Sequence, residues 1–274
     1  MVAYRYDGSF AGFLTCAWDA LEGKIEPMAF LLPEDGASLW ETREPAVDEG
    51  RAKRLYAALA RRVSPEFQKL IARGFLTCLP QKELDLLALI RRGLGEGDRV
   101  RLDLSDPVVA RVNLALTKMW TEWDHLKGFV RFSELDGMLV GEIEPKNRVL
   151  PLLAPHFAER FPGERLVLYD RTHHEVFLSD RGRWQLQPAE DFRMGPAGER
   201  ERAFRAMWRK YFQTIAIEGR RNPKCQSAHL PKRYRHVMTE FITDQDMEKS
   251  LPGQAPAGSL GAGDPPAEST AASK

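Results

Sequence analysis

The residues best suited to acid–base chemistry lie in the middle of the chain. Glu142 and Glu144 are two positions apart on an expected strand, so their side chains should share one face. His156 and Arg160 are four apart on the helix expected next, and carboxylates beside histidine and arginine suit proton transfer or activation of a water molecule. Asp7 is a further acidic candidate. The alternative, and the commoner arrangement, is that the glutamates face solvent and His156 packs on the sheet.

A second chemical feature is a strongly basic segment. The chain has 40 Lys+Arg and 39 Asp+Glu, but ten of the basic residues and one acid, Glu218, lie between residues 202 and 236. The segment therefore carries a charge of +9 and the rest of the chain −8. Such asymmetry favours a polyanion, or an acidic partner or domain. The residues expected to contact nucleic acid are Arg205, Arg209, Arg220, Arg221, Asn222, Lys224, Lys232, Arg233 and Tyr234.

Two interpretations of this segment stay open. Lysine and arginine bind phosphates with release of counterions, and nearby aromatic rings such as Tyr211 and Tyr234 could stack on unpaired bases. Alternatively, the segment is a solvated surface or an arm that clamps onto the acidic remainder of the chain. Within its first helix, the aromatic stripe is expected to face the core rather than bases; its members are Phe204, Trp208, Tyr211 and Ile215.

The spacing of cysteines and histidines gives no sign of a resident metal or cofactor. Cys16, Cys78 and Cys225 form no Cys-x-x-Cys pair, and the sequence has no His-Glu-x-x-His. His173 and His174, adjacent on an expected strand, would point to opposite faces. We expect no metal and no cofactor. Three separated cysteines are typical of a reduced, cytosolic protein, so a cytoplasmic location is expected.

Composition and periodicity predict an α+β fold. With 43% apolar and 29% charged residues, the chain should bury a core. No apolar run approaches the roughly 18 residues of a membrane span, and the first ten residues do not resemble a secretory signal. We expect no membrane contact.

Residues 1–127 should form a mainly helical part with one strand at its start. Residues 4–6 are strand-like, and Asp7 or Ser9 could cap the following helix. Residues 33–50 hold six acids and one basic residue and are expected to be an acidic loop. Four helices should follow and form a bundle. Two begin with a cap followed by proline, at Ser64 and Asp106.

Residues 128–240 should form a second unit, of β-β-α-β-β order, with an antiparallel sheet and a helix across one face. Asp136-Gly137 marks the turn of its first hairpin. The basic segment follows as an amphipathic helix and then as an arm. Prolines in the arm predict an extended or turn-rich chain there. Residues 241–274 are poor in aromatic residues and rich in alanine, glycine and proline, so a disordered tail is expected.

Four separated motifs occur in an order that resembles a known family. They are residues 4–10 (YRYDGSF), 132–137 and 142–145 (FSELDG, EIEP), 149–161 (VLPLLAPHFAERF), and a C-terminal set at 208–211, 220–224 and 231–234 (WRKY, RRNPK, PKRY). Together they resemble a bacterial family named for DNA repair or DNA metabolism, whose members carry a domain of unknown function. The resemblance implies a partner radical S-adenosylmethionine protein, and a related domain also occurs fused to uracil-DNA glycosylase-like domains. It implies no catalytic residue.

The leading hypothesis is therefore a DNA-binding accessory to a radical S-adenosylmethionine enzyme. This chain lacks a suitable cysteine triad, so the iron–sulfur cluster would belong to the partner. One alternative is an enzyme acting on damaged DNA or modified bases through Glu142, Glu144, His156 and Asp7. Another is a protein-interaction subunit that makes no contact with DNA.

Overall fold

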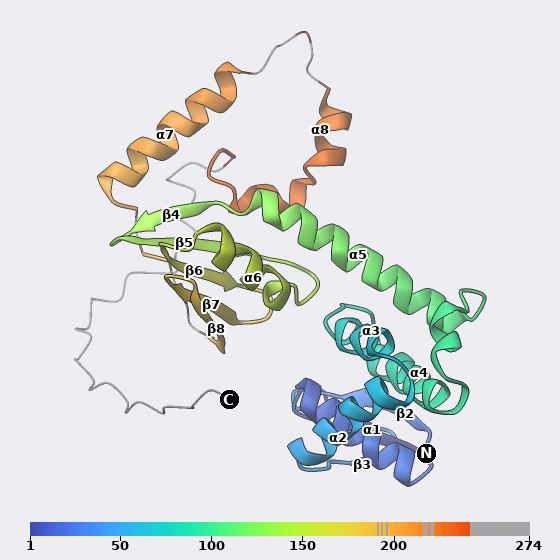
Figure 1. Cartoon of the computed structure of the whole chain (residues 1–274). Coiled ribbons are helices and arrows are strands. Elements are labelled where there is room, and N and C mark those ends of the chain that lie inside the picture. Colours follow the sequence, from blue (N-terminus) through green and yellow to red (C-terminus); the bar gives the residue numbers. More distant parts are fainter. Residues whose placement is uncertain (191, 193, 196, 216–218, 220–221, 242–274) are drawn as a thin grey trace, which may run out of the picture.

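The computed structural model describes residues 1–190, 192, 194–195, 197–215, 219 and 222–241. Figure 1 shows two sheets of different size, separated by helices, with one long helix running between them. The α+β class predicted from the sequence is confirmed. The expected tail, at residues 241–274, lies outside the described residues except for Phe241.

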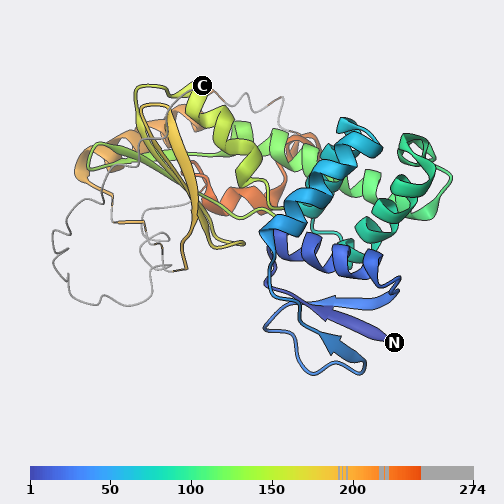
Figure 2. The ribbon, with the colours of Figure 1, turned by 60° about the horizontal axis from the view of Figure 1, so that its bottom comes forward.

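The smaller sheet is parallel and lies against the first helix (Figure 2). Its strands are β1 (Val2–Arg5), β2 (Pro27–Leu31) and β3 (Glu41–Arg43), in the order β2-β1-β3. Helix α1 (Phe10–Glu22) begins as predicted at Ser9, whose hydroxyl accepts a hydrogen bond from the Gly12 amide at 2.9 Å. The acidic loop expected at residues 33–50 is corrected in part, because it contains β3 and the start of the next helix. Three residues are too few for their alternation to show a strand.

The helices after this sheet match the four predicted from the sequence. Ser64 and Asp106 cap the second and fourth of them, and each is followed by proline at the first helical position. The elements are α2 (Glu49–Arg62), α3 (Pro65–Phe75), α4 (Lys82–Glu96), the 3₁₀-helix η1 (Asp98–Leu102) and α5 (Pro107–Phe129). None of the helices in the described ranges is long and apolar enough to cross a membrane.

Helix α5 belongs to two hydrophobic cores. Val109 and Val112, near its start, pack into a core built mainly from α1–α4. Met119 and Leu126, further along, pack into a second core under the larger sheet. Leu116 lies between these pairs and contacts both cores. A single helix therefore connects the two parts of the chain.

The larger sheet has five strands, one more than expected. They are β4 (Phe132–Leu135), β5 (Met138–Ile143), β6 (Arg165–Asp170), β7 (Glu175–Asp180) and β8 (Arg183–Pro188), paired in sequence order. Helix α6 (Leu150–Arg160) connects β5 to β6, so these two strands are parallel, and the other pairs are antiparallel. Strand β8 is an exposed edge strand that was not predicted, although Trp184 and Leu186 alternate with polar residues there.

The described residues of the basic segment include helical elements on the side of α5 and β4 (Figure 1). The predicted amphipathic helix is α7 (Glu199–Thr214). The arm, expected to be extended or turn-rich, instead contains α8 (Pro223–His229) and the 3₁₀-helix η3 (Lys232–Val237). Pro223 and Pro231 lie at or just before the first helical positions, where proline is tolerated because no amide hydrogen bond is needed there.

Gly93 and Gly95 on α4 offer a matched test of the first core. A Cβ at Gly93 would lie 2.6 Å from Cζ of the buried Phe67 ring, whereas at Gly95 it would meet open space. We expect Gly93→Ala to lower the free energy of unfolding by about 1–3 kcal/mol through overpacking. Gly95→Ala should raise it by about 0.5–1 kcal/mol. Urea unfolding checks both, and equal effects of the two substitutions would contradict this packing.

Cysteine reactivity tests the burial of α1. Burial raises the pKa of the Cys16 thiol to about 12, so the reactive thiolate is scarce at neutral pH. Cys78 and Cys225 are exposed. A maleimide should therefore label these two cysteines in the folded protein and Cys16 only after denaturation, as mass spectrometry would show. Rapid labelling of Cys16 in the folded protein would argue against this structure.

Candidate nucleic-acid interface

The candidate interface is attached to the rest of the protein through a buried carboxylate on α5. The Glu122 side chain is 1% exposed and lies in the turn between Met119 and Leu126, on the face that α5 presents to the second core. One of its oxygens accepts the Lys146 amide at 3.0 Å; the other accepts the backbone amide and side-chain amide of Asn147 at 2.8 and 2.6 Å. Hydrogen bonds on both oxygens compensate the cost of burying this charge.

The arm is anchored to this carboxylate. The Arg233 guanidinium lies 2.8 Å from Glu122 Oε1. It also lies over the ring of Tyr234 and donates a hydrogen bond to the hydroxyl of that tyrosine. Tyr234 is buried between His125 and Phe129 of α5, and burial raises the pKa of its hydroxyl. Of these two residues predicted to contact nucleic acid, Tyr234 is buried, whereas Arg233 is paired with Glu122 but keeps 40% of its side chain exposed.

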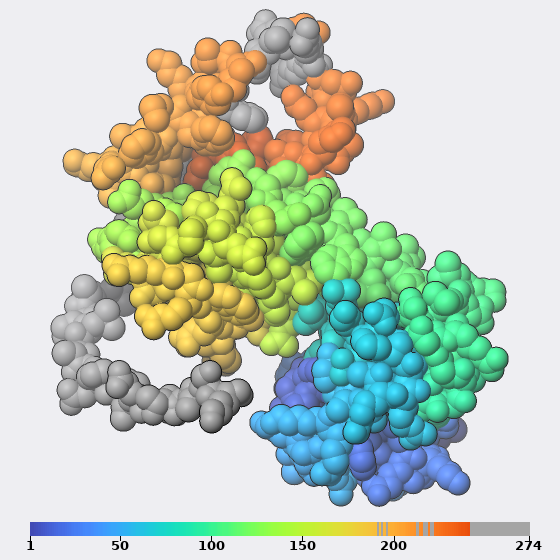
Figure 3. Space-filling model, viewed as in Figure 1, coloured from blue at the N-terminus to red at the C-terminus, as the bar shows by residue number. Residues whose placement is uncertain are grey.

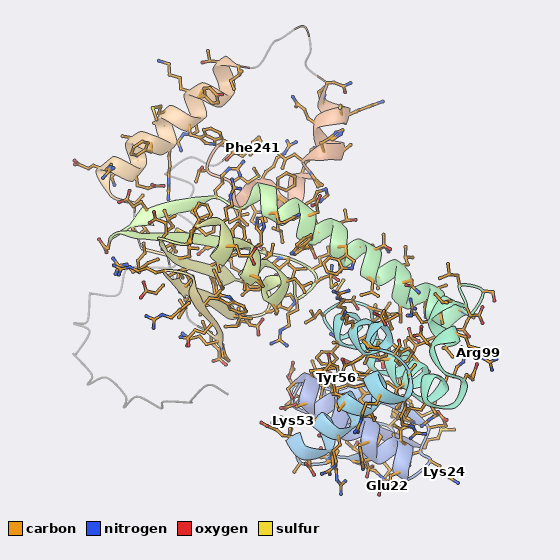
Figure 4. All side chains as sticks on the ribbon, in the orientation of Figure 1. Glu22, Lys24, Lys53, Tyr56, Arg99 and Phe241 are labelled. Carbon is orange, nitrogen blue, oxygen red and sulfur yellow. The ribbon has the colours of Figure 1, made fainter. Side chains whose placement is uncertain are left out.

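Further pairs hold the rest of the arm. His236 Nε2 lies 2.7 Å from Glu144 Oε2, and Arg131 pairs with Glu240 at 2.6 Å. The Arg235 guanidinium lies 5.1 Å from the ring centroid of Phe241, which is labelled in Figure 4. These contacts favour the clamping arm, which was the alternative interpretation, for residues 233–240.

The two arginines of α7 that were predicted to contact nucleic acid differ in how deeply they are buried. Arg205 is buried, with its guanidinium 2.8 Å from Glu201 and 2.6 Å from the Ser133 hydroxyl on β4. Arg209, one turn further along α7, is half-buried. Arg205 thus attaches α7 to the edge of the larger sheet.

The aromatic stripe of α7 is exposed, which corrects the expectation that it faces the core. Phe204, Trp208 and Tyr211 are 49%, 40% and 56% exposed. The rings of Trp208 and Tyr211 are stacked, with centroids 5.6 Å apart and planes at 26°. Because Arg205 occupies the side of α7 that meets β4, the aromatic side is left toward solvent. Figure 3 shows α7 and α8 projecting from the rest of the molecule.

Exposed cations lie on the same helix as this stripe and on α8 and η3. The described lysines and arginines that are exposed on α7, α8 and η3 are Arg200, Arg202, Lys210, Lys224, Lys232 and Arg233. The guanidinium of Arg200 lies 5.7 Å from the Phe204 ring centroid. Asn222, another predicted contact, caps α8 by accepting the Cys225 amide at 3.0 Å. Arg220 and Arg221 lie outside the described residues.

The acid–base candidates are not gathered into one site. Glu142 lies on the face of Val140, whereas α6, which carries His156, covers the opposite face through Ile143 and Phe157. Burial raises the pKa of Glu142, and Arg171 at 3.8 Å opposes this. The pKa of His156 is lowered by burial and by nearby cations.

The other two acidic candidates have structural partners of their own. Glu144 pairs with His236 of the arm, as described above. Asp7 lies far along the chain from these groups, at the start of α1, where it accepts the amide and hydroxyl hydrogens of Ser9. Each of the two therefore supports a local hydrogen-bonded arrangement.

The sequence interpretation missed a buried acid–histidine pair. Asp170 is fully buried at the end of β6 and lies 2.7 Å from His173 Nδ1. Its other oxygen accepts the amides of Thr172 and His173, so the same carboxylate holds the β6–β7 turn and orients the imidazole. An aspartate at the start of a turn with a histidine three residues later is the pattern that could have indicated it. Among the described residues, no three His, Cys, Asp or Glu side chains form a group that could hold a metal.

Glu122→Gln tests the anchoring of the arm. The substituted amide group would face a hydrogen-bond donor, so we expect the free energy of unfolding to fall by about 2 kcal/mol. The arm should also loosen, and limited trypsin digestion should cut faster after Lys232, Arg233 and Arg235. Glu159→Gln, on the exposed side of α6, is the control and should change neither quantity. Unchanged cleavage in Glu122→Gln would show that the arm does not depend on this carboxylate.

The helices and strands that form this candidate interface lie within a segment that matches a known family model. A family model for a domain of unknown function, DUF4130, matches residues 80–240. The matched segment contains α4, α5, the five-stranded sheet, α7, α8 and η3. No match to a curated protein was found. Because the family model covers more than half of the 274 residues, the chain belongs to the DUF4130 family.

Proposed function

We propose that this protein binds single-stranded DNA through α7 and the exposed cations of α8 and η3, as an accessory in DNA repair. The observation that carries the proposal is the exposed aromatic stripe of α7, flanked by lysine and arginine side chains. Proteins that bind single strands combine these two elements: cations follow the phosphates and rings stack on the bases.

The chemistry of the stripe favours a single strand over a duplex. Bases in a duplex are stacked on one another, so an exposed ring on a helix surface can reach them only where they are unpaired. The stacked pair of Trp208 and Tyr211 offers a flat surface of this kind. Lys210, which lies between them in the sequence, is exposed and available to a phosphate.

The repair context and the partner rest on the family resemblance. We propose a radical S-adenosylmethionine protein as the partner that supplies an iron–sulfur cluster. The cysteines of this chain support that division, since Cys16 is buried in the first core while Cys78 and Cys225 are exposed on separate elements. A uracil-DNA glycosylase-like protein is a second partner suggested by the same resemblance.

A protein-interaction subunit is the second candidate function, and one observation favours it. Met207 and Ile215 on α7 are aliphatic and are 61% and 55% exposed. Aliphatic side chains do not stack on bases, but they would be buried by a protein partner. In that case the same side of α7 would dock on a protein, and the cations would form the polar rim of the interface.

Fluorescence anisotropy with single-stranded and duplex oligonucleotides separates the two functions. Trp208→Ala/Tyr211→Ala should weaken single-strand binding at least about tenfold, because each stacked base contributes about 1–3 kcal/mol. Trp184→Ala removes an equally exposed tryptophan from β8 and should leave the affinity unchanged. No single-strand binding by the wild type, or equal losses in both variants, would refute the proposal.

The salt dependence of binding tests the role of the cations. Lys210→Ala/Lys224→Ala should reduce the slope of log affinity against log salt by about 0.7 for each phosphate that is no longer neutralised. Lys24→Ala/Lys53→Ala, which removes two exposed lysines of the N-terminal part, is a control of equal charge. An affinity that does not change between low and moderate salt would exclude a phosphate-binding surface here. Met207→Ser/Ile215→Ser should leave the affinity for the oligonucleotide unchanged, because aliphatic side chains do not stack on bases. These substitutions should weaken only the binding of a protein partner to α7.

A further inference from the structure

A cleft of about 500 Å³ lies between α3, η1 and α5, and no described residue of α7, α8 or η3 lines it. Its walls carry cations from α3 and η1, the indole of Trp120 from α5, and leucines from both sides. Its volume is within the range of about 300–1,000 Å³ that is typical of sites for small molecules. Figure 1 shows α3 lying beside α5 in this region.

The charge of the cleft is positive. Lys69 and Arg73, one turn apart on α3, are exposed, and neither forms an ion pair with any residue that the structure describes. Arg101 on η1 is held by Asp98 at 2.8 Å, which fixes its position at the wall. Glu66 is the one carboxylate lining the cleft within the described ranges. Three lysine and arginine side chains against one lining carboxylate therefore favour an anion.

The rest of the lining is suited to a flat apolar group. Trp120 is half-buried, with the Arg73 guanidinium 5.1 Å from its ring centroid, and it meets Trp123 edge-on at 5.3 Å. Leu102 and Leu104, which also line the cleft, are 64% and 65% exposed. These leucines and the Trp120 indole give the cleft apolar groups beside its cations.

We infer that this cleft binds a nucleotide. The phosphate is held by Lys69 and Arg73, and the base lies between the Trp120 indole and the exposed leucines of η1 and the loop after it. A purely apolar ligand would not need the cations, and a simple inorganic anion would not need the leucines, so their combination selects a ligand with both features. The nucleotide is either free in solution or one unit of a nucleic-acid strand, since the chemistry of recognition is shared.

Isothermal titration of the full chain with dAMP and with a short oligodeoxythymidine distinguishes these sources. The oligonucleotide is titrated into Trp208→Ala/Tyr211→Ala, so that binding at α7 does not contribute. Lys69→Glu/Arg73→Glu should weaken whichever ligand binds by at least about tenfold. The control, Arg61→Glu/Arg62→Glu, makes the same change in charge on exposed residues at the end of α2 and should keep most of the affinity.

Binding of dAMP that is lost in the α3 variant and kept in the α2 control identifies a free nucleotide. Binding of the oligonucleotide alone, with the same pattern, identifies a strand. If neither ligand binds, or if the two charge reversals weaken binding equally, the inference is overturned. Trp120→Leu adds a second criterion: it should weaken the nucleotide about fivefold and leave competition by inorganic phosphate unchanged. An equal loss of nucleotide affinity and of competition by inorganic phosphate would contradict the contact between the base and Trp120.

Discussion

The carboxylate of Glu122 has almost no access to water, and its partners come from two distant parts of the chain. The β5–α6 connection supplies amides from Lys146 and Asn147, and the C-terminal arm supplies Arg233. Asn147 in turn accepts the Cys78 amide at 2.9 Å, which attaches the loop between α3 and α4. A buried charge tolerates little rearrangement, since removal of any partner leaves it unsatisfied. The loop, the sheet and the arm are therefore held in one relative position on α5.

Because of this anchoring, the basic residues of the segment fall into two groups, those paired within the protein and those left exposed. Arg205 and Arg233 form ion pairs with acids of the same chain, and His236 lies within hydrogen-bond distance of Glu144. These contacts fix α7 and η3 in place. Arg202 and Lys210 on α7 stay exposed. A nearly neutral protein can thus present a locally positive surface, because part of its basic excess is used to build the support for the rest. The aromatic rings of α7 are held in the open by the same support.

The sequence predicted the elements best where local chemistry determines them. Ser64 and Asp106 cap their helices because a side-chain oxygen and a following proline act within one turn. Strands β2, β3 and β8 were missed. Strand β2 is a short apolar run and β3 has only three residues, whereas the alternation of Trp184 and Leu186 with polar residues in β8 was a detectable signal. The direction in which a basic residue points depends on tertiary contacts, so nothing in the run around Arg233 separates inward from outward cations. Glu122 was detectable in principle, as an acid at helical spacing between apolar neighbours on α5.

The range of the family match has a consequence for how α4 and α5 are covered. The segment that matches the family begins at residue 80, so it includes α4 and α5 but not α1–α3, which cover them. Leu86, Ile90 and Val109 are buried by that cover. A relative that consists of the matched segment alone must shield this apolar side with some other structure, such as a second protein or a different preceding domain. In this chain α1–α3 provide that shield, so they belong to the core on which α4 and α5 depend here.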